Sequence, residues 1–170
     1  MSRARLILVL AVLGVAVYTA AAGNSDPAPP ASASSSGRVT RVVDGDTIHV
    51  MVGGRDERVR FIGVDTPESV KPGTSVQCFA ERASAFNKRL VAGEQVRLVR
   101  DAEERDRYGR LLAYVYRARD GLFINATLVT GGYAVPLTIP PNVAHAQEFR
   151  TLAATARRKG RGLWSSCRSS

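Results

Sequence analysis

The sequence predicts a mainly β fold with helices (α+β), and three observations lead to this class. Five short segments rich in β-branched and aromatic residues are bounded by glycine and aspartate turns. One amphipathic helical pattern follows the third segment, and two helical patterns follow the fifth. The chain carries no visible internal repeat. A small barrel with helices added to its strands accommodates this order of elements.

The first three strands are expected to form a meander. The β-prone runs cover residues 38–43, 47–52 and 58–64. Asp44-Gly45-Asp46 separates the first two runs, and Gly53-Gly54 precedes the third. Both sequences are typical of tight turns, so neighbouring runs should pair in antiparallel fashion.

A helix is expected between the third and fourth strands. Its apolar residues recur at spacings of four, three and four and share one helix face: Phe79, Ala83, Phe86 and Leu90. The helix should stop near Gly93. Residues 95–99 and 111–116 are the fourth and fifth strands, and the charged loop 100–110 joins them.

Two more helices are expected after the fifth strand. Residues 124–130 form a short helix that ends at Gly131-Gly132. Asn142 can cap a final helix, whose basic residues 157–159 suit the negative end of the helix dipole. The apolar residues of this final helix are Val143, Phe149, Leu152 and Ala156. These elements together predict a five-stranded OB-type Greek-key barrel with three helices.

The N-terminal segment 1–22 has the features of a secretory signal peptide. Its apolar run follows two arginines and ends in alanines, which predicts cleavage after Ala22. An uncleaved membrane anchor is the alternative, because the run approaches the roughly 18 to 20 apolar residues that span a bilayer. Residues 23–36 are rich in Pro, Ala and Ser and predict a flexible linker, so 37–170 is the expected domain. We therefore expect a secreted or extracytoplasmic protein, held at a membrane only if the segment is retained.

The charge of the chain and its cysteine and histidine content bear on the partner that it binds, on a disulfide and on a zinc site. The formal net charge of +9 favours a polyanionic partner, although a soluble arginine-rich surface explains the same surplus. Two cysteines in an exported protein indicate a disulfide between Cys78 and Cys167. This bond should stabilise the fold by roughly 4 to 5 kcal/mol in the chain-entropy model. His49 and His145 stand apart from the cysteines and from each other, which argues against a zinc site.

Two acidic turns follow neighbouring expected strands. Each is explained by itself as an ordinary turn: Asp-Gly favours a hairpin, and Pro67 holds the preceding residue extended. Their positions, however, bring Asp46, Asp65 and Glu68 to one edge of the barrel. Clustered carboxylates repel one another unless a hard cation neutralises them. The sequence therefore favours a calcium site there.

Two arginines accompany these carboxylates. Arg60 lies in an otherwise apolar strand, where its guanidinium needs an anion unless the side chain extends its head into water. Arg110 ends a charged run and is either a phosphate ligand or part of a solvated loop paired with an acidic neighbour: Asp101, Glu103 or Glu104. A cation, two arginines and a carboxylate jointly supply what phosphodiester hydrolysis needs.

Four motifs in order make the chain resemble the staphylococcal nuclease (thermonuclease) family. They are VVDGDTIHV, VRFIGVDTPE, DRYGRLLAYV and the closing GLW, between Gly37 and about Trp164. The resemblance covers about three quarters of the chain and implies an OB-type barrel with three helices. It also implies a calcium-dependent phosphodiesterase that hydrolyses DNA and/or RNA by water attack. Such an enzyme cleaves the bond from phosphorus to the 5′ oxygen and leaves 3′-phosphate ends.

The resemblance assigns a role to each site residue. Calcium is held by the side chains of Asp46 and Asp65 and by the backbone carbonyl of Thr66. Glu68 binds the attacking water as the general base. Two further pairs contact the substrate: Arg60 and Arg110 hold the phosphate, and Arg107 and Tyr108 bind further substrate groups. A nucleic acid is then the expected partner, with no obligate protein partner and a monomeric chain.

One segment departs from the family pattern. Residues 137–141 contain no tyrosine, although the best-known member has tyrosines that line its nucleotide pocket there. We therefore expect weak mononucleotide binding, unless another aromatic residue such as Tyr133 provides the stacking. The alternative function is a non-catalytic OB-fold module that binds nucleic acid or protein. The retained carboxylates and arginines favour the enzyme.

Overall fold

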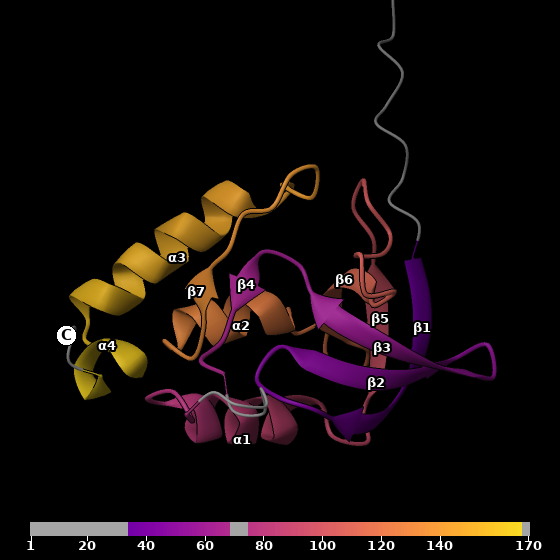
Figure 1. The fold of residues 1–170 in the computed structure, drawn as a ribbon, viewed down its shortest axis with the longest axis horizontal. Coiled ribbons are helices and arrows are strands. Elements are labelled where there is room, and N and C mark those ends of the chain that lie inside the picture. The colour runs from indigo at the N-terminus through magenta and orange to yellow at the C-terminus, as the bar shows by residue number, and fades with distance from the viewer. Residues whose placement is uncertain (1–33, 69–74, 168–170) are drawn as a thin grey trace, which may run out of the picture. The chain divides into compact units, whose positions relative to one another are not determined.

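Five strands close into a barrel in the order β1-β2-β3-β6-β5 in the computed structural model, which describes residues 34–68 and 75–167 (Figure 1). The strands are β1 (Ser34–Val42), β2 (Thr47–Val52), β3 (Arg55–Phe61), β5 (Gln95–Val99) and β6 (Leu111–Arg117). Four neighbouring pairs are antiparallel, and β3 pairs with β6 in parallel. The predicted α+β class with an OB-type five-stranded barrel is confirmed.

Several strand boundaries differ from the sequence prediction: the first strand begins four residues earlier, and the third is shifted three residues toward the N-terminus. β1 begins at Ser34, because residues 34–36, expected in the linker, pair with β5 through their backbone. Backbone pairing needs no apolar side chain, so composition did not reveal it. The third strand ends at Phe61 rather than residue 64, because Gly63 turns the chain with a φ of +77°.

A second, two-stranded sheet follows that turn. Its strands are β4 (Val64–Asp65) and β7 (Val135–Pro136), and the sequence did not predict β7. Gly63 leaves no room for a side chain, because a Cβ there would lie 2.5 Å from the ring of Phe149. The turn therefore brings β4 against the helical part of the domain and fixes the direction in which Asp65 leaves the barrel.

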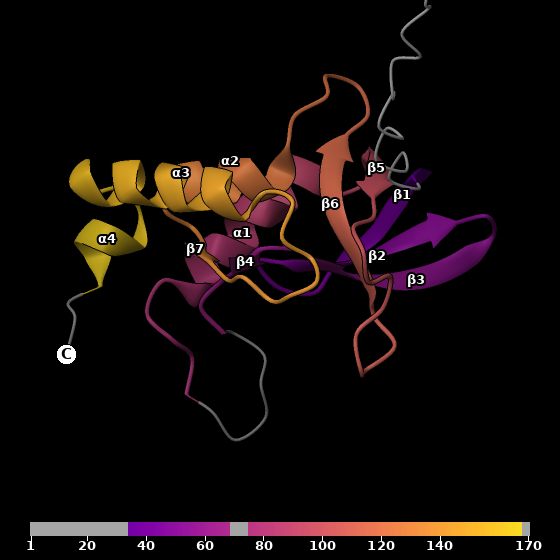
Figure 2. The same cartoon turned by 90° about the horizontal axis from the view of Figure 1, so that it is seen from above.

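The described residues form four helices: α1 (Ala80–Val91), α2 (Ile124–Thr130), α3 (Ala146–Arg158) and the short α4 (Leu163–Ser166), which was not predicted. Of these, α2, α3 and α4 lie to the left of the barrel in both views (Figure 2), whereas α1 lies below them in Figure 1. The buried residues of α1 are Ala80, Ala83, Asn87 and Val91. Phe86 and Leu90 are only partly buried. The expected face of α1 is therefore rotated toward Asn87, a polar residue that an apolar pattern does not include.

The predicted cap of the last helix is wrong. α3 begins at Ala146, four residues after Asn142. The Asn142 side chain instead accepts a hydrogen bond from the N–H of Glu103 at 2.7 Å and donates one to the carbonyl of Glu103 at 3.0 Å. Asn142 therefore joins the segment before α3 to the loop between β5 and β6.

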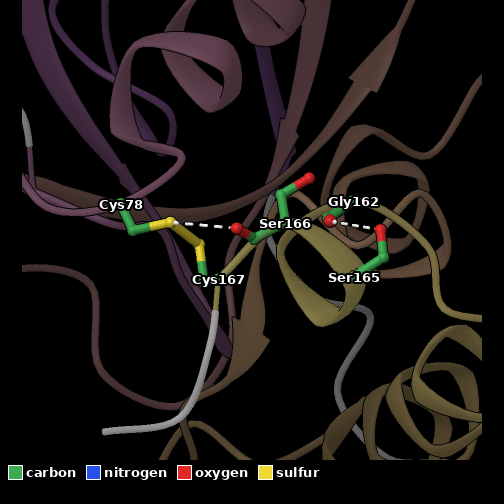
Figure 3. Close-up of a disulfide and its surroundings, with 5 residues drawn as sticks. All are labelled: Cys78, Gly162, Ser165, Ser166 and Cys167. Carbon is green, nitrogen blue, oxygen red and sulfur yellow. Dashed lines mark hydrogen bonds between the residues drawn. A yellow bond between two sulfur atoms is a disulfide. The ribbon is translucent and has the colours of Figure 1, made fainter.

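A disulfide joins Cys78 and Cys167, 89 residues apart, with their Cα atoms 5.9 Å from each other (Figure 3). Cys78 lies two residues before α1, and Cys167 directly follows α4. The bond thus links the start of the first helix to the end of the last.

The predicted leader and most of the predicted linker lie outside the described residues. Within residues 34–68 and 75–167, no helix has the length and hydropathy required to cross a bilayer.

Candidate active site

The turn between β1 and β2 holds the most buried carboxylate of the site. The backbone N–H of Asp46 donates to Asp44 Oδ1 at 3.0 Å, and that of Val43 donates to the carbonyl of Thr47 at 2.9 Å. Asn87 of α1 donates from Nδ2 to the carbonyl of Asp44 at 3.0 Å. Asp46 is only 5% exposed. The turn is therefore fixed both by its own backbone and by a helix 43 residues later.

Asp46 connects this turn to the end of β4. Its Oδ2 accepts hydrogen bonds from the N–H of Thr66 at 2.8 Å and from Thr66 Oγ1 at 2.9 Å. Its Oδ1 accepts one from Thr47 Oγ1 at 3.1 Å. Gly45 permits this approach, since a Cβ there would lie 2.6 Å from Thr66 Oγ1. The two acidic turns expected from the sequence are in direct contact.

Arg60 of β3 joins the same cluster. Its Nη1 donates to the carbonyls of Phe61 at 3.0 Å and Val64 at 2.8 Å. The same Nη1 lies 3.2 Å from Asp46 Oδ2, and Nη2 lies 2.8 Å from Asp65 Oδ1. The side chain is 13% exposed. Arg60 is therefore an ion-paired, largely buried cation, and the alternative of a head extended into water is wrong.

A polar cavity of about 70 Å³ gathers the predicted residues. Six of its lining residues are those assigned to catalysis and calcium: Asp46, Arg60, Asp65, Thr66, Glu68 and Arg110. Asp44 lines it as well. From the sequence, Asp44 was expected only as a turn residue, although its position two residues before Asp46 already placed it near the site.

The cavity is electrostatically crowded, with four carboxylates and two guanidinium groups on its walls. Burial, reinforced by the charge of Asp46, raises the pKa of Asp44 to about 6. Burial also raises the pKa of Asp65, with repulsion from Asp46 and Glu68 adding to the effect and Arg60 opposing it. Such a cluster of carboxylates favours the binding of a cation.

Arg110 enters the cavity from a turn that it helps to close. Its Nε lies 2.7 Å from Asp106 Oδ2, and Asp106 Oδ1 accepts the backbone N–H groups of Tyr108 and Arg110. Burial acts to raise the pKa of Asp106, but the Arg110 side chain and these backbone donors lower it below its usual value. The acidic partner of Arg110 is therefore Asp106, and none of the three carboxylates considered from the sequence.

Arg107 and Tyr108 lie on this turn but do not line the cavity. Arg107 Nη2 donates to Tyr108 Oη at 2.6 Å, and the Arg110 guanidinium lies 5.5 Å from the centre of the Tyr108 ring. Tyr108 is 67% exposed. The pair therefore forms an exposed extension of the site next to Arg110.

An adjoining pocket of about 200 Å³ shares Arg60 and Arg110 with the polar cavity. Its lining includes Leu112, Leu137 and Ile139, and no tyrosine. Tyr133 stacks on Phe86 with ring centroids 3.9 Å apart and does not line this pocket. The suggestion that Tyr133 replaces the missing pocket aromatics is therefore wrong.

The described residues hold no group of three or more His, Cys, Asp or Glu side chains arranged to bind a metal ion. Asp46 and Asp65 are turned toward Arg60 and Thr66, as their hydrogen bonds show. His49 contacts Asp56 and Arg41, and His145 contacts Glu148, so neither histidine takes part in the cavity. The three residues predicted to supply calcium with oxygen donors, Asp46, Asp65 and Thr66, line one cavity.

Comparison with known proteins agrees with this geometry. The model of the protein family described as "Staphylococcal nuclease homologue" matches residues 58–166. The thermonuclease of Staphylococcus intermedius is 44% identical over 126 residues, which are 74% of each chain. The chain belongs to the staphylococcal nuclease family. The thermonuclease of Staphylococcus hyicus is 41% identical over 75% of each chain. Endonuclease YncB of Bacillus subtilis (strain 168) is 42% identical over 74% of this chain and 59% of its own.

Three supporting residues of this staphylococcal nuclease homologue escaped the sequence analysis. Asp44 and Asn87 hold the β1–β2 turn, and Asp106 holds Arg110. The local sequence does not indicate the roles of Asn87 and Asp106. Asn87 has the pattern of an ordinary helix residue, and Asp106 that of an ordinary loop residue.

Proposed function

We propose that this protein is a calcium-dependent nuclease that hydrolyses DNA, RNA or both. The observation that carries the proposal is the small polar cavity in which four carboxylates meet Arg60 and Arg110. Relatives that are 41% to 44% identical are named thermonuclease, which supports a phosphodiester substrate. The formal net charge of +9 is compatible with binding a polyanion.

Calcium fits the chemistry of the donors. Asp46 and Asp65 offer carboxylate oxygens and Thr66 offers a backbone carbonyl, and calcium accepts such oxygens with loose geometry and completes its shell with water. The raised pKa values of Asp44 and Asp65 reflect a carboxylate cluster that a cation would relieve. When bound, the ion supplies positive charge to the phosphate and to the water that attacks it.

The two arginines would hold the phosphate in different ways. Arg60 is oriented by its bonds to the carbonyls of Phe61 and Val64, so it is already fixed before substrate arrives. Arg110 bonds to Asp106 only through Nε, and its two terminal amino groups make no hydrogen bond with a described residue. Those groups are available to bind two phosphate oxygens together. Both charges would stabilise the negative charge that develops in the transition state.

Glu68 is the proposed general base. The oxygen of a water forms a bond to phosphorus while the bond from phosphorus to the 5′ oxygen breaks. The proton of the water passes to the Glu68 carboxylate, and the 5′ oxygen takes a proton from solvent. The products are a 3′-phosphate end and a 5′-hydroxyl end. Arg107 and Tyr108, on the rim beside Arg110, would contact a further substrate phosphate.

Activity measurements test this function directly. The purified protein should cleave DNA or RNA with calcium, leave 3′-phosphate ends, and lose activity when calcium is chelated. Glu68→Gln should lower kcat by about a hundredfold to a thousandfold, since it removes a base and a charge while keeping the side-chain shape. Glu94→Gln is the matched control, because Glu94 pairs with Arg119 outside the cavity. Asp46→Ala should weaken calcium binding measured by calorimetry.

Two outcomes would reject this assignment. If the double variant Arg60→Ala, Glu68→Gln cleaves as fast as the unaltered protein, the cavity is not the active site. If the folded protein binds DNA and calcium but cleaves neither nucleic acid, the non-catalytic binding module is correct instead.

We also propose that the protein is exported and that its leader is removed. The supporting observation is the apolar run of segment 1–22 after two arginines. N-terminal sequencing of protein from the culture medium should begin near Gly23. Finding the chain only in membranes, with its original N-terminus, would instead favour the anchor.

A further inference from the structure

One residue holds the backbone of Glu68 from both sides. Gln77 accepts a hydrogen bond at its side-chain Oε1 from the N–H of Glu68 at 2.8 Å. The N–H of Gln77 donates to the carbonyl of Glu68 at 3.0 Å. Glu68 itself lies outside every helix and strand. Gln77, nine residues later, therefore supplies the contacts that regular secondary structure gives to other residues.

Gln77 is in turn anchored by the disulfide. Its neighbour Cys78 is bonded to Cys167, and the Cys78 sulfur also lies 3.8 Å from the carbonyl oxygen of Ser166 in α4 (Figure 3). Phe79, which follows Cys78, is the N-cap residue of α1, and its ring lies 5.4 Å from that of Tyr133. The segment that carries Gln77 is thus fixed at its C-terminal side.

The far end of the disulfide is also firmly held. The N–H of Leu163, the first residue of α4, donates to the carbonyl of Gly132 at 2.9 Å. Gly132 and Gly162 approach so closely that a Cβ on either would lie 2.2 Å from a carbonyl oxygen: that of Arg161 for Gly132, and that of Gly132 for Gly162. α4 is therefore packed against the turn that follows α2. The contacts run without interruption from this turn through the disulfide to Glu68.

We propose that Gln77 is a positioning residue for Glu68 and that the Cys78–Cys167 disulfide holds Gln77 in place. The inference rests on the proposed nuclease function, in which Glu68 is the base. A base is effective only within a narrow range of distances from its water, so a small displacement of the Glu68 backbone lowers turnover. Phosphate binding depends on Arg60 and Arg110 and is affected little.

The first test separates turnover from substrate binding. Gln77→Met removes the side-chain acceptor and keeps a similar length. It should lower kcat about three- to tenfold, as expected for one lost hydrogen bond, with KM within about twofold. Gln95→Met is the matched control, because Gln95 is an exposed residue of β5 away from the cavity. Gln77→Glu keeps an acceptor and should recover most of the lost kcat.

The second test does not depend on cleavage. Amide hydrogen exchange followed by NMR should show the Glu68 N–H protected in the unaltered protein and exchanging about tenfold faster in Gln77→Met. In the Cys78→Ser, Cys167→Ser background this N–H should already exchange faster. Adding Gln77→Met there should lower kcat by a smaller factor than in the disulfide-bonded protein, since both changes loosen the same contact.

Equal kcat for Gln77→Met and Gln95→Met, or unchanged exchange of the Glu68 amide, would overturn the positioning role. If the unaltered protein cleaves no nucleic acid, the proposed function fails, and the catalytic role of Gln77 fails with it. In that case the exchange experiment still shows whether Gln77 fixes Glu68.

Discussion

Two turns contribute to the cavity, and they are built in different ways. The β1–β2 turn, with Asp44 and Asp46, is held by residues far away in the chain: Arg60, Thr66 and Asn87. The β5–β6 turn is closed mainly by its own residues. Asp106 bonds to Tyr108 and Arg110, and Arg105 bonds to the carbonyl of Gly109. The ion pair between Arg105 and Glu57 connects this turn to β3, and the bonds of Glu103 to Asn142 connect the preceding loop residues to the segment before α3.

Because of this difference, we expect substitutions in the two turns to affect stability and activity in different proportions. A substitution in the first turn disturbs buried groups that several elements share, so stability and activity should change together. A substitution in the second turn affects a local, more exposed set of contacts, so activity should change with little effect on stability. Three experiments test this contrast.

The two arginines should give the largest effects. Arg60→Ala and Arg110→Ala should each lower kcat about a hundredfold to a thousandfold, because each removes charge that faces the transition state. Only Arg60→Ala should also destabilise the fold, by about 3 kcal/mol, since it leaves Asp46 buried without its cation. Urea unfolding and steady-state kinetics measure both effects. Equal losses of stability in the two variants would contradict the contrast.

Asp106→Asn should have an intermediate effect. The asparagine keeps an oxygen that accepts the backbone N–H groups of Tyr108 and Arg110 but loses the charge that fixes the Arg110 side chain. We expect kcat/KM to fall about tenfold, the difference between a charged and a neutral hydrogen bond. Asp120→Asn is a suitable control, since Asp120 makes the same kind of ion pair with Arg117 outside the cavity. An unchanged kcat/KM would show that Arg110 needs no such support.

Asp44→Asn should give the smallest effect, and one that depends on pH. The pKa of Asp44 is about 6 in the folded protein against an ordinary value of 3.8. The folded state therefore binds the proton more tightly, so this group favours folding below pH 3.8 and loses that contribution as pH rises through about 6. In calcium-free protein, Asp44→Asn should raise the free energy of unfolding at pH 7.5 by on the order of 1 kcal/mol.

Urea unfolding at pH 7.5 and at pH 3.5 checks this prediction. The gain should be nearly lost at the lower pH, where Asp44 is protonated in the folded state and mostly protonated in the unfolded state. Calcium should reduce the gain at pH 7.5, since the ion neutralises the same charge. A gain that is independent of pH would show that repulsion at Asp44 is not its cause.

Local patterns predicted the barrel strands and the main site residues, because turns and strands have short-range signatures. Residues 95–99 and 124–130 were predicted with their observed bounds, since each is bordered by clear turn or glycine signals. β7 and α4 were missed because a two-residue strand and a four-residue helix leave no periodic pattern.

Local patterns likewise predicted part of the site. The sequence placed Asp46, Asp65 and Glu68 together because the two acidic turns follow neighbouring strands, which were expected to end at one edge of the barrel. The partner of Arg110 could not be chosen among several nearby carboxylates, and the role of Asn87 depends on how α1 is rotated. Contacts of this kind are decided by tertiary packing, which a single sequence does not display.

Closure of the barrel has one further consequence. Because β1 pairs with β5 and β3 pairs with β6, each of the five barrel strands has a neighbour on both sides. A strand of a second molecule therefore finds no long row of unpaired backbone groups on which to add. The other described sheet consists of β4 and β7, and each of these strands is two residues long. The fold thereby offers little template for the strand-to-strand assembly that begins amyloid growth.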